Sequence, residues 1–150
     1  MLFVGSGQDE DELKGIISKN NMEQEIIMCG RITDRKLLAA IYARADLFLF
    51  PSLYDASSIV QIEAASQKTP TLFVEGAATT ATITENVNGF ICKNNENDFA
   101  EKINEIITNE KLYEYVSENA YKDIYVNWDS QVKKVFNSYI EIIEKQNSKQ

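Results

Sequence analysis

Short apolar runs punctuate the first 92 residues of the chain and alternate with longer amphipathic stretches. The runs occupy residues 2–4, 26–29, 47–50, 71–74 and 90–92. Largely apolar runs of this length are typical of strands buried on both faces, and such strands usually belong to parallel sheets covered by helices. We therefore predict five parallel strands at these positions.

The stretches between the runs have the i, i+3, i+4 spacing of helices. Leu13, Ile16 and Ile17 predict a helical face after the first strand, and Thr33 or Asp34 can cap the helix after the second. The buried face of that second helix is expected to consist of four residues: Leu37, Leu38, Ile41 and Tyr42. Strands alternating with helices predict an α/β fold: a Rossmann-like three-layer sandwich with a parallel sheet and right-handed crossovers.

The chain after residue 92 is expected to form several C-terminal helices. Phe99, Ile103, Ile106 and Ile107 share one face, and a second stripe contains Leu112, Val116 and Ala120. A last helix carries an apolar stripe, which we expect to pack on this domain rather than on a membrane. This stripe consists of Val132, Val135, Phe136, Tyr139, Ile140 and Ile143. Residues 76–84 predict a loop with at most a single helical turn.

Length and composition fit one soluble domain. The chain has 150 residues and a net charge of -8, which argues against nucleic-acid binding because that requires neutralised phosphates. The absence of histidine excludes serine triads and histidine-ligated metals within the chain. Cys29 and Cys92 are predicted to be reduced core thiols. No signal peptide or membrane-spanning run is visible, so a cytoplasmic location is expected.

The first strand ends at Gly5-Ser6-Gly7, which resembles part of a dinucleotide-binding turn. The third glycine of that fingerprint would stand at position 10, which is Glu10. Residues 9–12 are all acidic and would repel a phosphate, whereas they stabilise the positive end of a helix dipole. A close backbone approach to a neutral group remains open for the glycines.

Residues 46–63 contain the strongest candidate site. A strand closed by Pro51 leads through Asp55 to a helix that begins at Ser57 or Ser58. The free amides of such a helix N-terminus can bind an anion such as a diphosphate. Glu63 is expected to share the helical sector of Ile59 and Ile62, where a carboxylate needs a partner. The alternative is a capping role for Ser57 and a structural ion pair for Glu63.

A family resemblance covers nearly the whole chain. The segment F-P-S-L-Y-D-A-S-S-I-V-Q-I-E, preceded by C-G-R-I-T-D and followed by N-V-N-G-F, resembles the carboxyl-terminal donor-binding domain of family 4 retaining glycosyltransferases with the GT-B fold. The most diagnostic feature of that family is a pair of acidic residues separated by seven others, ordinarily two glutamates. Here the pair is Asp55 and Glu63.

The resemblance implies roles for these residues in binding a nucleotide diphosphate sugar, UDP- or GDP-linked, without a metal or another cofactor. Glu63 would bind the ribose hydroxyls and Asp55 the transferred sugar, as the catalytic pair. Ser57, Ser58, Ile59 and Val60 would hold the diphosphate. The base would lie beside Gly30, Arg31 and Ile32, with Gly5 and Gly7 also near the donor.

Two departures from the family pattern accompany the resemblance. Ala56-Ser57-Ser58 replaces a loop rich in glycine and phenylalanine, and Asp55 replaces a glutamate. The family's basic diphosphate-binding residues and its amino-terminal acceptor domain would lie upstream of Met1. That domain is the implied partner, and part of the apolar stripe in residues 132–143 could pack against it. It would also bind a hydroxyl acceptor, a cell-envelope glycan or glycolipid, and contact the inner face of the membrane peripherally.

Two other functions are compatible with the same scaffold. A non-catalytic binding or interaction module could keep a Rossmann-like fold, because fold does not fix function. A receiver-type or flavodoxin-like domain would have a similar sheet but no role for the acidic pair.

Overall fold

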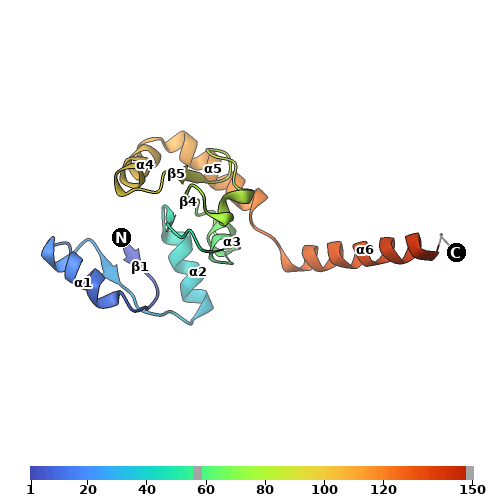
Figure 1. Ribbon diagram of the computed structural model, residues 1–150, viewed down its shortest axis with the longest axis horizontal. Helices are drawn as coiled ribbons and strands as arrows, with labels where there is room; N and C mark the ends of the chain where they lie inside the picture. The colour runs from blue at the N-terminus through green and yellow to red at the C-terminus, as the bar shows by residue number, and fades with distance from the viewer. Residues whose placement is uncertain (56–58, 148–150) are drawn as a thin grey trace. The chain divides into compact units, whose positions relative to one another are not determined.

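The computed structural model describes residues 1–55 and 59–147 (Figure 1). The chain divides into two compact units, Met1–Ile41 and Tyr42–Gln150. Each unit contains one sheet, and every strand pair within the two sheets is parallel. Parallel strands joined through helices confirm the predicted α/β class.

The first unit is built on a two-stranded sheet. Strand β1 (Leu2–Phe3) pairs with β2 (Ile27–Met28), and helix α1 (Glu10–Lys19) connects them. Ile17 is the one buried side chain among residues 1–41, with 7% exposure. The expected buried positions Ile16 and Leu37 are 51% and 50% exposed, because two short strands offer too little surface to cover them.

Helix α2 (Arg35–Arg44) begins in the first unit and ends in the second. The carboxylate of Asp34 accepts hydrogen bonds from the amides of Lys36 and Leu37, at 2.8 and 3.2 Å. Asp34 is therefore the cap of α2, one of the two residues that the sequence suggested for this role.

The second unit is built on a three-stranded sheet in the order β3-β4-β5. The strands are β3 (Phe48–Phe50), β4 (Thr71–Val74) and β5 (Phe90–Cys92). Every residue of the central strand β4 is buried. The core combines β4 and β5 with the helices α4 (Glu96–Thr108) and α5 (Glu110–Asp123), through Leu72, Val74, Phe90, Cys92, Ile106 and Val116. The bounds of β4 and β5 are those that the sequence predicts.

Helix α3 (Ile59–Ser66) packs through small side chains. Ala64 and Ala65 are 0% and 1% exposed, and Ala65 packs against Ala120 of α5. Alanines allow the two helices to approach closely. The close packing fixes the orientation of α3, and with it the direction in which the rest of its side chains point.

The segment between β4 and β5 is a 3-10 turn followed by a tight bend. The turn, η1, covers Ala78–Thr82, within the predicted loop. The buried side chain of Asn88 then closes the bend, because its oxygen accepts from the Thr84 amide at 2.8 Å and its nitrogen donates to the Thr82 carbonyl at 3.3 Å. Asn88 thus closes a turn that lies directly before β5.

The last helix, α6 (Trp128–Asn147), has no buried residue, so the expectation that its apolar stripe packs on this domain is wrong. Phe136 and Tyr139 are 62% and 63% exposed.

In helix α4, Ile107 is 62% exposed, although helical spacing predicts that it is buried. No helix within residues 1–55 and 59–147 is long and apolar enough to cross a membrane.

Both cysteines are free thiols, as the sequence predicted, but only Cys92 lies in the core and Cys29 is half-buried. Cys92 is buried and donates to the Phe73 carbonyl at 3.3 Å. Its burial raises the pKa of the thiol above the ordinary value, with smaller contributions from Asp98 and Glu85. A buried thiol with a raised pKa is a poor nucleophile, so Cys92 is a structural residue.

Candidate functional site

Two glycine turns meet at the carboxyl ends of β1 and β2 in the first unit. The Gly5 amide donates to the Gly30 carbonyl at 2.9 Å. Gly5 and Gly30 have φ angles of +148° and +64°, which residues other than glycine rarely adopt. Ile32 is half-buried and Arg31 exposed. The structure therefore brings together the two glycine segments that the family resemblance assigns to the donor site.

A pocket of about 210 Å³ opens beside the first of these turns. Apolar side chains and the backbone of the turn line it, together with the two acidic residues at the start of α1. The lining consists of Phe3, Val4, Gly5, Ser6, Gly7, Asp9, Glu10, Leu13 and Met28. A Cβ built on Gly5 or Gly7 would meet no atom within 4 Å. The glycines are thus not required by packing within the chain.

The N-terminus of α1 is acidic, as the sequence predicted. Glu10, Asp11 and Glu12 occupy its first turn, and Glu10 forms an ion pair with Lys14 at 2.8 Å. This pair raises the pKa of the exposed Lys14. Carboxylates at this position stabilise the helix dipole and disfavour a bound phosphate.

The second group of candidate residues follows the carboxyl end of β3 in the second unit. Asp55 is exposed, and α3 begins four residues later at Ile59, whose side chain is 70% exposed. Val60 and Glu63 are half-buried. Ser57 and Ser58 lie outside the described residues. The structure thus places an acidic residue on either side of the start of α3, after a parallel strand, where open α/β sheets bind ligands.

The helical sector expected for Glu63 is only partly buried: Ile62 packs against the cluster of Ala65 and Ala120, whereas Ile59 is 70% exposed. The buried face of α3 consists of Gln61, Ala64 and Ala65, whereas Ile59 lies one turn before Glu63 on an exposed face. Ala65 and the half-buried Ile62 pack in one cluster with Ala120 of α5. Glu63 therefore stands at the margin of the core.

Tyr42, near the end of α2, is an electrostatic neighbour of Glu63. Burial, and secondly the negative charge of Glu63, raises the pKa of Tyr42 to about 12. The sequence indicated Tyr42 only as a buried helix residue. No local signal could have paired it with Glu63, because 20 positions separate them in the chain.

The described parts of the chain contain no group of three cysteine or acidic side chains that could hold a metal ion. The site that the resemblance implies would bind its ligand through carboxylates, glycine amides and the start of α3.

Parallel strands connected through helices define a class of α/β, Rossmann-like domains. The sequence profile of the family Glycosyl transferases group 1 matches residues 1–123, about four-fifths of the chain. The chain belongs to this family, and its fold corresponds to one half of a GT-B glycosyltransferase.

Relatives and solved structures agree with this assignment. An uncharacterized glycosyltransferase of Methanocaldococcus jannaschii is 26% identical over 142 residues, which cover 93% of this chain and 36% of that protein. HepE of Anabaena, solved in complex with UDP-glucose, matches with a TM-score of 0.74 and 21% identity over 91% of this chain and 40% of its own.

A third match is an isolated domain. The C-terminal domain of the group 1 glycosyltransferase LpcC from Francisella tularensis has a TM-score of 0.68 and 21% identity, covering 78% of this chain and 62% of that one. The chain spans about a third of the length of the curated relatives it matches, at 36% and 33%.

Proposed function

We propose that residues 1–150 form the nucleotide-sugar-binding, carboxyl-terminal domain of a retaining GT-B glycosyltransferase. The donor would be a UDP- or GDP-linked hexose, and the acceptor a hydroxyl group of a cell-envelope glycan or glycolipid. The acceptor would bind to an amino-terminal domain. Membrane contact of the complete enzyme would also occur through that domain, and the 150 residues alone would transfer little sugar.

The observation that carries the proposal is the position of Asp55 and Glu63. They flank the start of α3, after the carboxyl end of β3, in a chain whose family transfers sugars. Glu63 would accept hydrogen bonds from the two ribose hydroxyls, since its oxygens suit a vicinal diol. Asp55 would contact hydroxyls of the transferred sugar.

The leaving diphosphate would lie at the N-terminus of α3. Amides of Ser57, Ser58, Ile59 and Val60 would donate to its oxygens, and the helix dipole would stabilise its charge without a metal ion. The acidic start of α1 is unsuited to this task. Gly5, Gly7 and the segment from Gly30 through Arg31 to Ile32 would instead border uncharged parts of the donor.

Isothermal titration calorimetry with UDP, GDP and ADP tests donor binding directly. We expect one of the three to bind, and Glu63→Ala to weaken that binding at least about tenfold, roughly 1.4 kcal/mol, because the ribose hydroxyls lose their acceptor. Absence of binding by all three at millimolar concentration would contradict the proposal.

The matched control is Glu101→Ala, which removes an exposed glutamate from α4 in the same unit. This variant should bind the nucleotide as the unchanged protein does. If Glu63→Ala lowers the melting temperature but leaves the affinity intact, Glu63 has a structural role instead.

A non-catalytic binding module is the second candidate. Asp55 and the Ala56-Ser57-Ser58 loop, which depart from the family pattern, favour it. The two functions differ in a donor-hydrolysis assay on the chain joined to an amino-terminal domain of the family. An enzyme should release the nucleoside diphosphate, whereas a binding module should remain inactive.

A further inference from the structure

The segment between β4 and β5, residues 75–89, leaves the sheet at the same edge as the segment that carries Asp55. Strands β3 and β4 are parallel neighbours in the second unit, with Phe50 opposite Phe73 in the ladder. Neighbouring strands lie roughly 4.8 Å apart, so the chain after β3 and the chain after β4 start side by side. Ligands of open α/β sheets bind at this carboxyl edge.

Packing holds the β4–β5 segment beside helix α3. Ile83, directly after η1, and Ile62 of α3 pack against the same cluster, which contains Ala65. The helix and the segment both begin at the carboxyl edge of the sheet and lead away from it. Followed back towards that edge, α3 reaches its first residue, Ile59, and the segment reaches Thr79. Thr79 therefore lies on the side of α3 where the helix begins.

The side chain of Thr79 is buried without a hydrogen-bond partner. It is 4% exposed, and its hydroxyl finds no donor or acceptor within residues 1–55 and 59–147. A buried hydroxyl without a partner is destabilising, because it has lost its hydrogen bonds to water. The neighbouring Thr80 differs, since its hydroxyl donates to the Ala77 carbonyl at 2.7 Å. Thr79 thus has a bonding group that the described part of the chain does not use.

The same segment contains a second buried side-chain atom for which the described residues supply no partner. This atom is the side-chain oxygen of Asn86. Asn86 comes shortly before the amino end of β5, whereas Thr79 follows the carboxyl end of β4, and parallel strands have these ends at opposite edges of the sheet. The edge at which ligands bind therefore concerns Thr79 and not Asn86.

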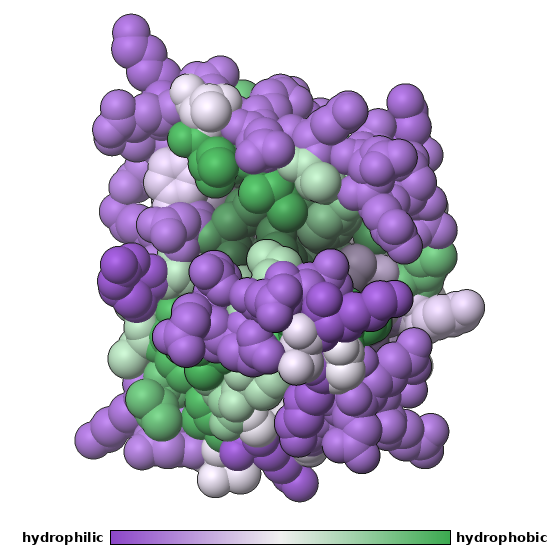
Figure 2. All heavy atoms as spheres, turned by 90° about the vertical axis from the view of Figure 1, so that its left-hand side faces the viewer, coloured by the Kyte–Doolittle hydropathy of each residue, from purple (hydrophilic) through white to green (hydrophobic). Residues whose placement is uncertain are grey.

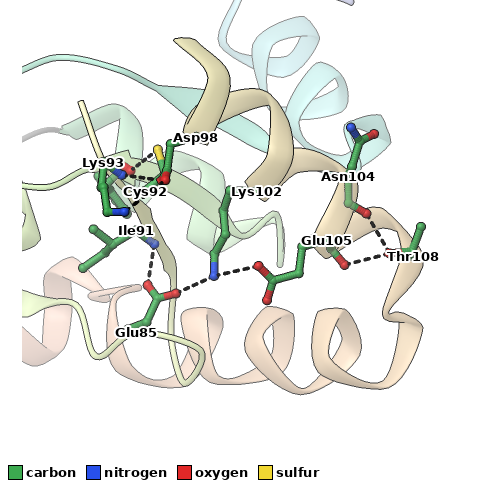
Figure 3. A network of polar contacts seen from close by, with 10 residues as sticks. Glu85, Ile91, Cys92, Lys93, Asp98, Lys102, Asn104, Glu105 and Thr108 are labelled. Atoms are coloured by element: carbon green, nitrogen blue, oxygen red, sulfur yellow. Dashed lines mark hydrogen bonds and ion pairs between the residues drawn. The ribbon is translucent and has the colours of Figure 1, made fainter. Parts of the chain in front are cut away.

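Contacts further along hold the β4–β5 segment in place, so that Thr79 is not free to move to the surface. The Glu85 carboxylate accepts a hydrogen bond from the Ile91 amide at 2.5 Å and pairs with Lys102 at 2.9 Å (Figure 3). The side chain of Lys102 is only 14% exposed. Between η1 and β5, the buried Asn88 side chain closes the bend. The segment therefore presents the Thr79 hydroxyl in a fixed position.

We propose that the Thr79 hydroxyl binds the diphosphate of the sugar donor by donating a hydrogen bond to one of its oxygens. The inference rests on the proposed function, which locates the diphosphate at the N-terminus of α3. A diphosphate fits because it supplies charged acceptors, and hydrogen bonds to charged oxygens are stronger than those between neutral groups. Thr79 would add to the donor site a residue from the segment after β4, whereas Asp55 and Glu63 follow β3.

Thermal denaturation and isothermal titration calorimetry of Thr79→Val test the inference together. Valine replaces the hydroxyl with a methyl group of similar size. The free chain should melt about 2–4 °C higher, because it loses an unpartnered buried polar group. The affinity for the nucleoside diphosphate that the unchanged chain binds should fall about tenfold, because the diphosphate loses a donor. A residue that serves only the fold would not combine a gain in stability with a loss of affinity.

Thr79→Ser and Thr80→Val are the matched variants. Serine keeps the hydroxyl, so Thr79→Ser should bind the nucleotide more tightly than Thr79→Val does. Thr80→Val removes a hydroxyl that is bonded to Ala77. This variant should therefore lower the melting temperature and leave the affinity unchanged.

Two results would overturn this inference alone. A lower melting temperature for Thr79→Val would show that the hydroxyl has a partner within the chain. An unchanged affinity would show that the diphosphate does not reach the hydroxyl. If the unchanged chain bound none of UDP, GDP and ADP, the proposed function would be wrong as well, and this inference with it.

Discussion

The strands of the two units have equally apolar sequences but very different surroundings. In the first unit, Leu2 of β1 and Ile27 of β2 are 49% and 53% exposed. Figure 2 shows green, apolar side chains open to solvent among purple, polar ones. In the second unit, Leu72 and Phe73 of β4 are both fully buried. An apolar run therefore predicts a strand, but its burial depends on how many other elements lie against it.

The substitution expected to reduce the stability of the chain most lies in the core of the second unit. Phe90 is fully buried among side chains of β4, α4 and α5. Phe90→Ala should lower the free energy of unfolding by about 3–5 kcal/mol, because it removes apolar contacts and leaves a cavity. Urea denaturation followed by circular dichroism measures this change. A loss below about 1 kcal/mol would mean that the second unit is no better packed than the first.

The next effect is a loss of stability at alkaline pH. Burial and Glu63 raise the pKa of Tyr42 from 10.0 to about 12 in the folded chain. The folded state therefore favours the neutral phenol. This contribution is fully present below pH 10 and is lost as the pH rises through about 12, on the order of 2–3 kcal/mol in total.

Urea denaturation between pH 8 and 12 measures this step, and Tyr42→Phe should remove it. Burial raises the pKa of Tyr113 as well, so Tyr113→Phe serves to separate the second contribution. Glu63→Gln should shrink the Tyr42 step without abolishing it, since burial is the larger cause. An unchanged step in Tyr42→Phe would contradict the assignment.

A smaller effect is expected beside β5, at the ion pair between Glu85 and Lys102. Glu85→Ala should cost about 1–3 kcal/mol, because it leaves the Ile91 amide and the largely buried Lys102 without their shared acceptor. Glu85→Gln should cost less, since an amide oxygen can still accept from Ile91. Thermal denaturation measures both variants. The control Glu105→Gln alters a 54% exposed side chain and should cost below about 0.5 kcal/mol.

The smallest effect is expected in the first unit. Ile27→Ala in β2 should change the free energy of unfolding by less than about 1 kcal/mol, because the side chain is already 53% exposed. The same denaturation experiment as for Phe90→Ala measures it. A loss comparable to that of Phe90→Ala would show that β2 is covered in solution and would remove the difference between the units.

Much of this fold could be predicted from local sequence. The bounds of β4 and β5 agree with the prediction to the residue, because both strands are buried and flanked by turns. Side-chain burial was less predictable. Ile16, Leu37 and Ile107 satisfy helical spacing but are at least half exposed, since spacing identifies a face and not the element that covers it.

The candidate site was likewise predictable only where its residues are close in sequence. Asp55 and Glu63 lie in one short segment, so their spacing alone placed them on either side of the start of α3. The proximity of Tyr42 to Glu63, and of Glu85 to Lys102, depends on packing between elements distant in sequence. The prediction that Glu63 shares a sector with Ile59 and Ile62 was met only in part, because Ile62 packs against the core cluster but Ile59 is exposed.

One buried hydrogen bond has a consequence for ligand affinity. The Thr69 hydroxyl, 2% exposed, donates to the Tyr42 carbonyl at 2.6 Å and fastens the last turn of α2 to the loop before β4. Tyr42 is the electrostatic neighbour of Glu63, so the main chain of this neighbour is held in place before any ligand arrives. A molecule that contacts Glu63 would not have to order the main chain at Tyr42, which reduces the conformational entropy lost on binding.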